Sequence, residues 1–95
     1  MSEWKYVLPT ALRGQLVESI HEPNYSEILN MLHKCYDWIL ANVDEYDEID
    51  YDRDIDDIEF WQDGTVTEDD ADEIDYLLSN FYDVCDAYHI WASAI

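Results

Sequence analysis

Two long stretches of this sequence carry apolar residues at the three- and four-residue spacing of an α-helix, and this pattern limits the fold more than any other feature. The first stretch contains Ile28, Leu29, Leu32, Cys35, Tyr36, Ile39, Leu40 and Val43. The second contains Ile74, Leu77, Leu78, Phe81, Val84, Cys85, Tyr88 and Trp91. Each stripe would form one face of a helix and must be buried against another element. The sequence therefore predicts two long helices, packed antiparallel.

Capping residues indicate where these helices begin. Asn24 stands three residues before Glu27, and Thr67 stands three residues before Asp70. At a helix N-terminus, a side chain of this kind often accepts a hydrogen bond from a backbone N–H of the first turn. An acid three residues later then accepts a hydrogen bond from the backbone N–H of the capping residue. The first long helix is expected to run from this cap to about Val43.

The other expected elements are shorter or less clearly patterned. The second long helix should span about residues 68–92. After Pro9, the spacing of the apolar residues predicts a short N-terminal helix that carries Leu12, Leu16, Val17 and Ile20. In residues 44–64 the apolar residues fit both the spacing of a helix and the alternation of a strand. We favour one or two short helices there.

The length and composition indicate one folded unit. Ninety-five residues suffice for a single modest core, and no linker-like segment divides the chain. Hydrophobic residues make up 48% of the sequence and 14 residues are aromatic (four Trp, eight Tyr, two Phe), which is too much for a disordered acidic chain. We therefore expect a mainly α, all-helical bundle with a single domain over residues 1–95.

The charge is extreme and concentrated. The chain has twenty-four Asp and Glu residues and four Lys and Arg residues, which gives a formal net charge of −20. Seventeen of the acids lie between Asp44 and Asp75, a segment whose one basic residue is Arg53. Such a surface repels nucleic acids and anionic membranes and attracts a basic partner. Neither direct nucleic-acid binding nor membrane binding is expected.

Rows of carboxylates can stand in for rows of phosphates. Acids four residues apart on a helix are separated by about 6 Å along its axis. Phosphates along one DNA strand follow each other every 3.4 Å or so of axis, and about twice that along the backbone. The acids expected to contact a partner are Asp44, Glu45, Asp47, Glu48, Asp50, Asp52, Asp54, Asp56, Asp57, Glu59, Asp63, Glu68, Asp69, Asp70, Asp72, Glu73 and Asp75.

Aromatic residues lie among these acids. Tyr46, Tyr51 and Trp61 are candidate anchors for a basic partner, and Phe60 lies beside them. The alternative, that these rings cover the core, remains open at this point.

Other kinds of site find little support. The chain shows no nucleophile motif or phosphate-binding loop, so no enzymatic activity and no cofactor are expected. The three His residues are scattered, and Cys35 and Cys85 have no zinc-type spacing, so no metal site is expected and both thiols should be buried. No segment reads as a signal or membrane-spanning sequence, which favours a cytoplasmic protein.

In length, helical patterning and clustered acids the chain resembles the small DNA-mimic proteins of phages and mobile elements, the anti-restriction and anti-CRISPR proteins. No motif aligns, so no residue role carries over. The resemblance implies a stoichiometric inhibitor that blocks the basic DNA-binding site of a CRISPR effector or, next in order, a restriction enzyme. An immunity protein or antitoxin against a basic nuclease, and an acidic cation-binding module, are the alternatives. Homodimerisation is left open.

Overall fold

The computed structural model describes residues 4–92, and these residues form a mainly α fold, which confirms the expected class. The elements in chain order are β1 (Tyr6–Val7), α1 (Thr10–His21), α2 (Tyr25–Asn42), α3 (Glu48–Gln62), the 3-10 helix η1 (Glu68–Asp70), α4 (Ala71–Ala87) and β2 (Ile90–Trp91). None of the helices in this part of the chain combines the length and the apolar character needed to cross a lipid bilayer.

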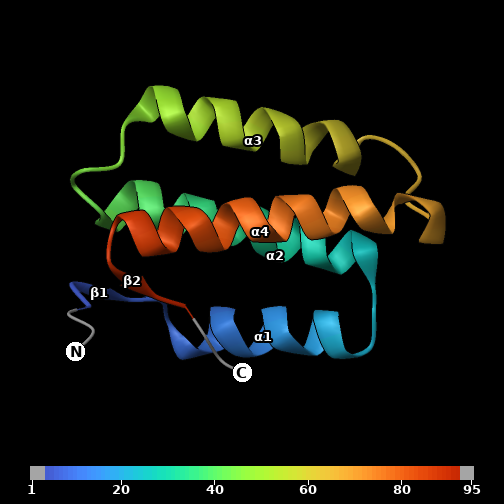
Figure 1. The fold of residues 1–95 in the computed structure, drawn as a ribbon, viewed down its shortest axis with the longest axis horizontal. Coiled ribbons are helices and arrows are strands. Elements are labelled where there is room, and N and C mark those ends of the chain that lie inside the picture. The colour runs from blue at the N-terminus through green and yellow to red at the C-terminus, as the bar shows by residue number, and fades with distance from the viewer. Residues whose placement is uncertain (1–3, 93–95) are drawn as a thin grey trace.

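The helices form a compact arrangement with α2 and α4 in the middle. Figure 1 shows α3 on one side of this pair and α1 on the opposite side. The apolar stripes of α2 and α4 supply most of the buried side chains, including Leu32, Ile39 and Phe81. The ring of Tyr36 meets that of Phe81 edge to face at 5.5 Å between centroids. The core thus lies where the sequence pattern placed it.

The acidic connection differs from its expected form. Residues 48–62 form the single 15-residue helix α3 instead of one or two short helices, and α3 runs alongside α2 and α4 (Figure 1). The chain therefore returns to the starting end of α2 before α4 begins, and α4 runs parallel to α2. Two ring contacts show that the helices run in the same direction. Tyr36 contacts Phe81, and further along the chain Tyr46 contacts Tyr88, so residue numbers rise together on both sides. The expectation of two antiparallel long helices is wrong.

The C-terminal helix is shorter than expected. α4 ends at Ala87, and His89 adopts a positive φ of 58° that turns the chain away. Ile90 and Trp91 then form β2, which pairs in parallel with β1 in the register Tyr6 to Ile90. Trp91 therefore leaves the helical face assigned to it, and its ring receives the Arg13 guanidinium at 4.3 Å instead.

Both predicted caps form, the first at the start of α2 and the second at the start of η1, which leads into α4. Oδ1 of Asn24 accepts from the N–H of Glu27 at 3.1 Å, although the Asn24 N–H itself donates to the carbonyl of Ser19. At the second cap, the N–H of Thr67 donates to Oδ2 of Asp70 at 3.0 Å. The second cap is a reciprocal capping box, and it precedes η1 and then α4.

Cys35 and Cys85 are both free and buried, as expected. Burial removes the thiolate from water and raises the pKa of each thiol to about 12. Both thiols pack as small apolar groups within the core.

Candidate protein-binding site on α3 and α4

Helix α3 forms in spite of its charge. Seven acids and one Arg lie within its 15 residues, and five pairs of acids stand three or four residues apart. Such pairs cost about 0.2–0.5 kcal/mol each. Burial of Ile55 and Ile58 against the core contributes about 1.5–3 kcal/mol per side chain, so packing outweighs the repulsion.

The start of α3 is fixed by local hydrogen bonds. Oδ1 of Asp47 accepts from the N–H of Ile49 at 2.7 Å, which satisfies one of the free donors of the first turn. Glu48 and Asp50 lie in that turn, where the positive end of the helix dipole stabilises them. Three of the candidate acids therefore also stabilise the helix that presents them.

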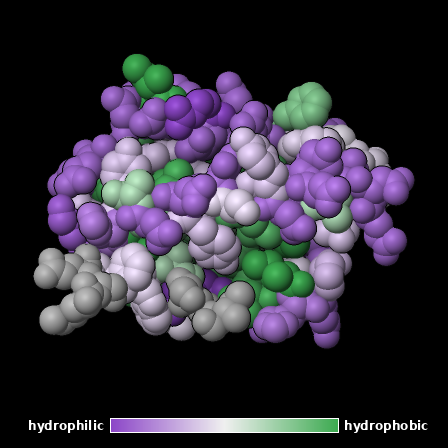
Figure 2. Space-filling model, in the orientation of Figure 1, coloured by the Kyte–Doolittle hydropathy of each residue, from purple (hydrophilic) through white to green (hydrophobic). Residues whose placement is uncertain are grey.

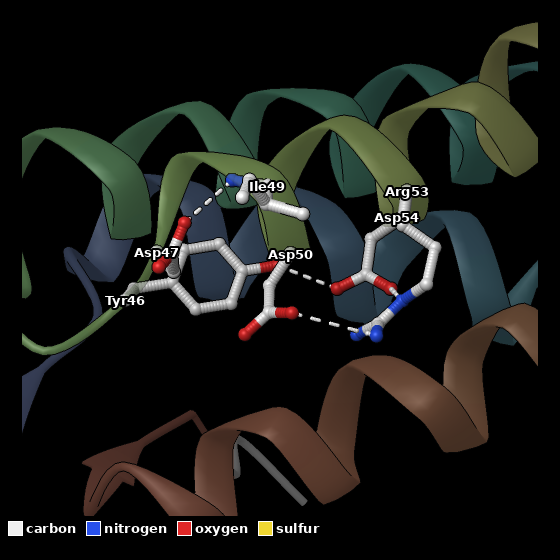
Figure 3. A network of polar contacts seen from close by, with 6 residues as sticks. All are labelled: Tyr46, Asp47, Ile49, Asp50, Arg53 and Asp54. Atoms are coloured by element: carbon white, nitrogen blue, oxygen red, sulfur yellow. Dashed lines mark hydrogen bonds and ion pairs between the residues drawn. The ribbon is translucent and has the colours of Figure 1, made fainter.

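A polar network ties the first half of α3 to the preceding loop (Figure 3). The Tyr46 hydroxyl donates to Oδ2 of Asp54 at 2.5 Å, while Arg53 pairs with Asp50 at 3.4 Å and with Asp54 at 3.5 Å. Burial, followed by the hydrogen bond to Asp54, raises the pKa of Tyr46 well above its usual value. The negative charges of Asp54 and Asp50 raise the pKa of Arg53. The single base of the segment is thus already paired with acids of its own helix.

A second network joins α3 to α2. The hydroxyl of Tyr51 donates to Oδ1 of Asp37. Near the end of α3, Nε2 of Gln62 donates to Asn30 at 2.9 Å, and Oε1 of Gln62 lies 3.0 Å from Nδ1 of His33. These contacts hold one flank of α3 against α2 and leave its opposite face in solvent.

The predicted acids are placed on one connected region that covers the loop before α3, the outer side of α3 and the start of α4. Fourteen of them are exposed: Asp44, Glu45, Asp47, Glu48, Asp52, Asp56, Asp57, Glu59, Asp63, Glu68, Asp69, Asp72, Glu73 and Asp75. Asp50, Asp54 and Asp70 are half-buried, because they pair with Arg53, Tyr46 and the Thr67 N–H. Glu45 pairs with Lys5 at 3.4 Å.

An open groove of about 310 Å³ separates α3 from α4. Its lining residues include Asp54 and Asp57 from α3 and Tyr76, Asn80 and Asp83 from α4. Asp83 was not among the predicted acids, because the prediction followed acid density along the chain. Asp83 lies eight residues after Asp75, a spacing that places both residues on the same side of α4.

The aromatic candidates divide between core and surface. Tyr46, expected as a partner contact, is 5% exposed and belongs to the core, where its ring meets Tyr88 at 5.4 Å. Tyr51 and Trp61 are half-buried against the core. Phe60, which was not selected as a candidate anchor, is 71% exposed. The spacing of the apolar residues in α3 could have indicated this exposure, because Phe60 lies outside the stripe formed by Ile55 and Ile58.

Within residues 4–92, the structure brings together no group of three His, Cys, Asp or Glu side chains able to hold a metal ion. Five of the seven acids of α3 are exposed, and this arrangement spreads the carboxylates along a surface. It presents charge to a large partner more readily than it surrounds a small ion.

No family model, curated protein or solved structure matches this chain in a comparison with known proteins.

Proposed function

We propose that this protein is a DNA mimic that binds the basic nucleic-acid-binding site of a bacterial defence nuclease and blocks DNA binding. The CRISPR effector is the favoured target and a restriction enzyme is the next. The observation that carries the proposal is α3, a continuous and mostly solvent-facing helix with seven acids, whose only base is paired internally.

The spacing of the acids supports this proposal. Asp52, Asp56 and Asp63 lie four and then seven residues apart, so successive carboxylates are offset by about 6 and about 10 Å along the helix. The helix is about 22 Å long, which is the axial rise of six to seven nucleotides of one strand. A groove that holds phosphates with Lys and Arg can form charge-assisted contacts with such a row.

The distribution of charge also favours one binding side. Figure 1 places α3 on the side of the molecule opposite α1. Of the four bases, Arg13 lies on α1 and Lys34 on α2, while Lys5 and Arg53 are paired with acids of the candidate region. A basic partner would therefore be steered toward the α3 side, with fast and salt-sensitive association.

The test is competition with fluorescently labelled duplex DNA for a guide-loaded CRISPR effector and for a restriction enzyme, at low and moderate salt. Displacement of DNA that weakens with salt is expected for one of them. Asp52→Asn/Asp56→Asn should weaken displacement about 2- to 30-fold, since each exposed ion pair contributes about 0.2–1 kcal/mol. Glu18→Gln/Glu22→Gln removes the same charge at the end of α1 and should leave displacement unchanged.

Failure of the protein to displace DNA from either enzyme would remove the support for this function. Equal weakening by both double variants would show that net charge, and no particular face, drives binding. Circular dichroism spectra of both variants must match the parent protein before either result is interpreted.

A further inference from the structure

Two large apolar side chains stand out on the acidic face of α3. Ile49 is 76% exposed and Phe60 is 71% exposed. They are eleven residues apart, which is close to three helical turns, so both lie on the same side of α3 about 16 Å apart along the axis. Figure 2 shows mostly hydrophilic surface over α3, with apolar surface near each end of the helix.

The Phe60 ring is held in place. Its centroid lies 5.4 Å from the Trp61 ring at an interplanar angle of 88°, and Trp61 packs against the core. An edge-to-face contact of this kind restricts the ring while most of its surface remains in water. Phe60 is therefore an oriented aromatic surface.

Acids surround this ring within one helical turn on each side. Asp56 and Asp57 precede Phe60 by four and three residues, and Asp63 follows it by three. Side chains at these spacings are neighbours on a helix. The charge makes two occupants of this face unfavourable: a second copy of the same −20 chain and an anionic membrane.

We propose that the outer face of α3 docks into a groove that holds single-stranded nucleic acid, with Phe60 in the place of a stacked base and the flanking acids in the place of phosphates. This inference rests on the function proposed above and names the kind of groove involved. Grooves for single strands combine Lys and Arg with aromatic side chains on which bases stack. A groove for duplex backbone holds phosphates while the bases remain stacked inside the helix.

The distinction concerns what the ring can contact. On a duplex-binding surface the row of carboxylates alone would pair with the basic side chains. An exposed Phe ring within that row would contact only charged groups. In a single-strand groove the same ring meets an aromatic side chain and loses its contact with water. Ile49 provides a second apolar contact at the other end of the row. Guide-loaded effectors also contain a groove for the displaced single strand, so this target class remains the favoured one.

The experiment uses two labelled probes on a guide-loaded CRISPR effector. One is a 20-nucleotide oligo(dT) strand, which matches the ~20-nucleotide displaced strand in length, and the other is a target duplex. The full-length protein should displace the single strand. Phe60→Leu should weaken displacement roughly 5- to 150-fold, the effect of about 1–3 kcal/mol per stacked base, and Phe60→Trp should retain it. Trp4→Leu is the matched control, because Trp4 is a 42% exposed ring that precedes β1 and lies outside α3 and α4.

Each outcome separates this inference from the function it rests on. Displacement of the duplex alone, or a Phe60→Leu variant as active as the parent while Asp52→Asn/Asp56→Asn is weakened, would overturn the single-strand groove and leave DNA mimicry standing. Equal losses from Phe60→Leu and Trp4→Leu would also overturn it, since no particular ring would matter. No displacement of either probe would overturn both.

Discussion

The hydroxyl of Tyr46 donates a 2.5 Å hydrogen bond to Oδ2 of Asp54, and this contact joins the loop before α3 to the second turn of the helix. The ring of Tyr46 lies in the core, whereas Asp54 borders the groove between α3 and α4. The pair therefore connects the apolar interior with the acidic surface. Because α3 buries only Ile55 and Ile58 fully, this hydrogen bond should contribute substantially to its docking.

Tyr46→Phe should lower the free energy of unfolding by about 1–2 kcal/mol, within the range for hydrogen bonds to charged groups. The ring stays and only the hydroxyl is lost, so the core packing is preserved. Urea unfolding followed by circular dichroism measures the change. Tyr76→Phe removes an exposed hydroxyl and should shift stability by less than about 0.5 kcal/mol. A Tyr46→Phe protein as stable as the parent would show that Asp54 does not anchor α3.

Thr67→Ala should destabilise the C-terminal half of the protein. Thr67 accepts through its hydroxyl from the Asp69 N–H at 3.3 Å and donates through its own N–H to Asp70. Loss of an N-cap side chain costs about 0.5–2 kcal/mol. Thr65→Ala changes an exposed residue just outside the cap and should have little effect in the same thermal melts. Similar melting temperatures for the two variants would contradict a stabilising role for the capping box.

Stability should fall in alkaline solution because of the buried thiols. Burial raises the pKa of Cys35 and Cys85 to about 12 in the folded state, above the unfolded value of about 8.5. The unfolded chain therefore loses thiol protons first, so the contribution of the thiols to stability is fully present well below pH 8.5 and declines from there to about pH 12. Two thiols together give a slope approaching 2.7 kcal/mol per pH unit.

Cys35→Ala isolates one thiol. The variant will be less stable at neutral pH, because a buried side chain is shortened, but its stability should decline less steeply with pH by about 1.4 kcal/mol per unit. Urea unfolding at half-unit steps from pH 8 to pH 10 gives both slopes. Burial also raises the pKa of Tyr36, Tyr46, Tyr51 and Tyr82, but these tyrosines add the same slope to both proteins, so the difference between the two slopes reports Cys35. Identical slopes in the parent and the variant would show that Cys35 ionises as readily in the folded chain as in the unfolded one.

Gly14→Ala should stabilise the protein. Gly14 lies inside α1 and is exposed, and a Cβ added there would meet no atom within 4 Å. Alanine is favoured over glycine in a helix interior by about 0.8–1 kcal/mol. The melting temperature should rise by several degrees in a domain of this size. A decrease would mean that α1 tolerates no side chain at this position, contrary to the open space around it.

The sequence predicts the helices whose apolar residues repeat regularly. In α2 and α4 the repeating apolar residues fix the buried face, apart from Trp91, which lies in β2, while Asn24 marks the start of α2 and Thr67 the turn that leads into α4. Local patterning determines these features, because helix caps and side-chain periodicity depend on residues within one or two turns.

The features that depend on distant partners are not predictable in the same way. The end of α4 depends on the pairing of Ile90 with Tyr6, 84 positions earlier in the chain. Helix α3 has few apolar residues, and its stability depends on contacts with α2 and on the Tyr46 hydrogen bond. The acidic segment follows from charge density along the chain, whereas the burial of Tyr46 depends on contacts of its ring with Tyr36 and Tyr88.

Salt should raise the melting temperature of the parent protein, because counterions screen the repulsion among the acids of α3. Differential scanning calorimetry between about 20 and 300 mM NaCl would cover a change of Debye length from roughly 20 to 6 Å. Asp52→Asn/Asp56→Asn should melt higher than the parent at low salt and gain less from added salt, since three of the five like-charge pairs on α3 are removed. Glu18→Gln/Glu22→Gln removes two charges from the far side, where fewer acids lie close together, and should gain nearly as much from salt as the parent does. The difference between the two double variants therefore measures how much of the repulsion is concentrated on α3, and equal salt responses would mean that the whole surface shares it.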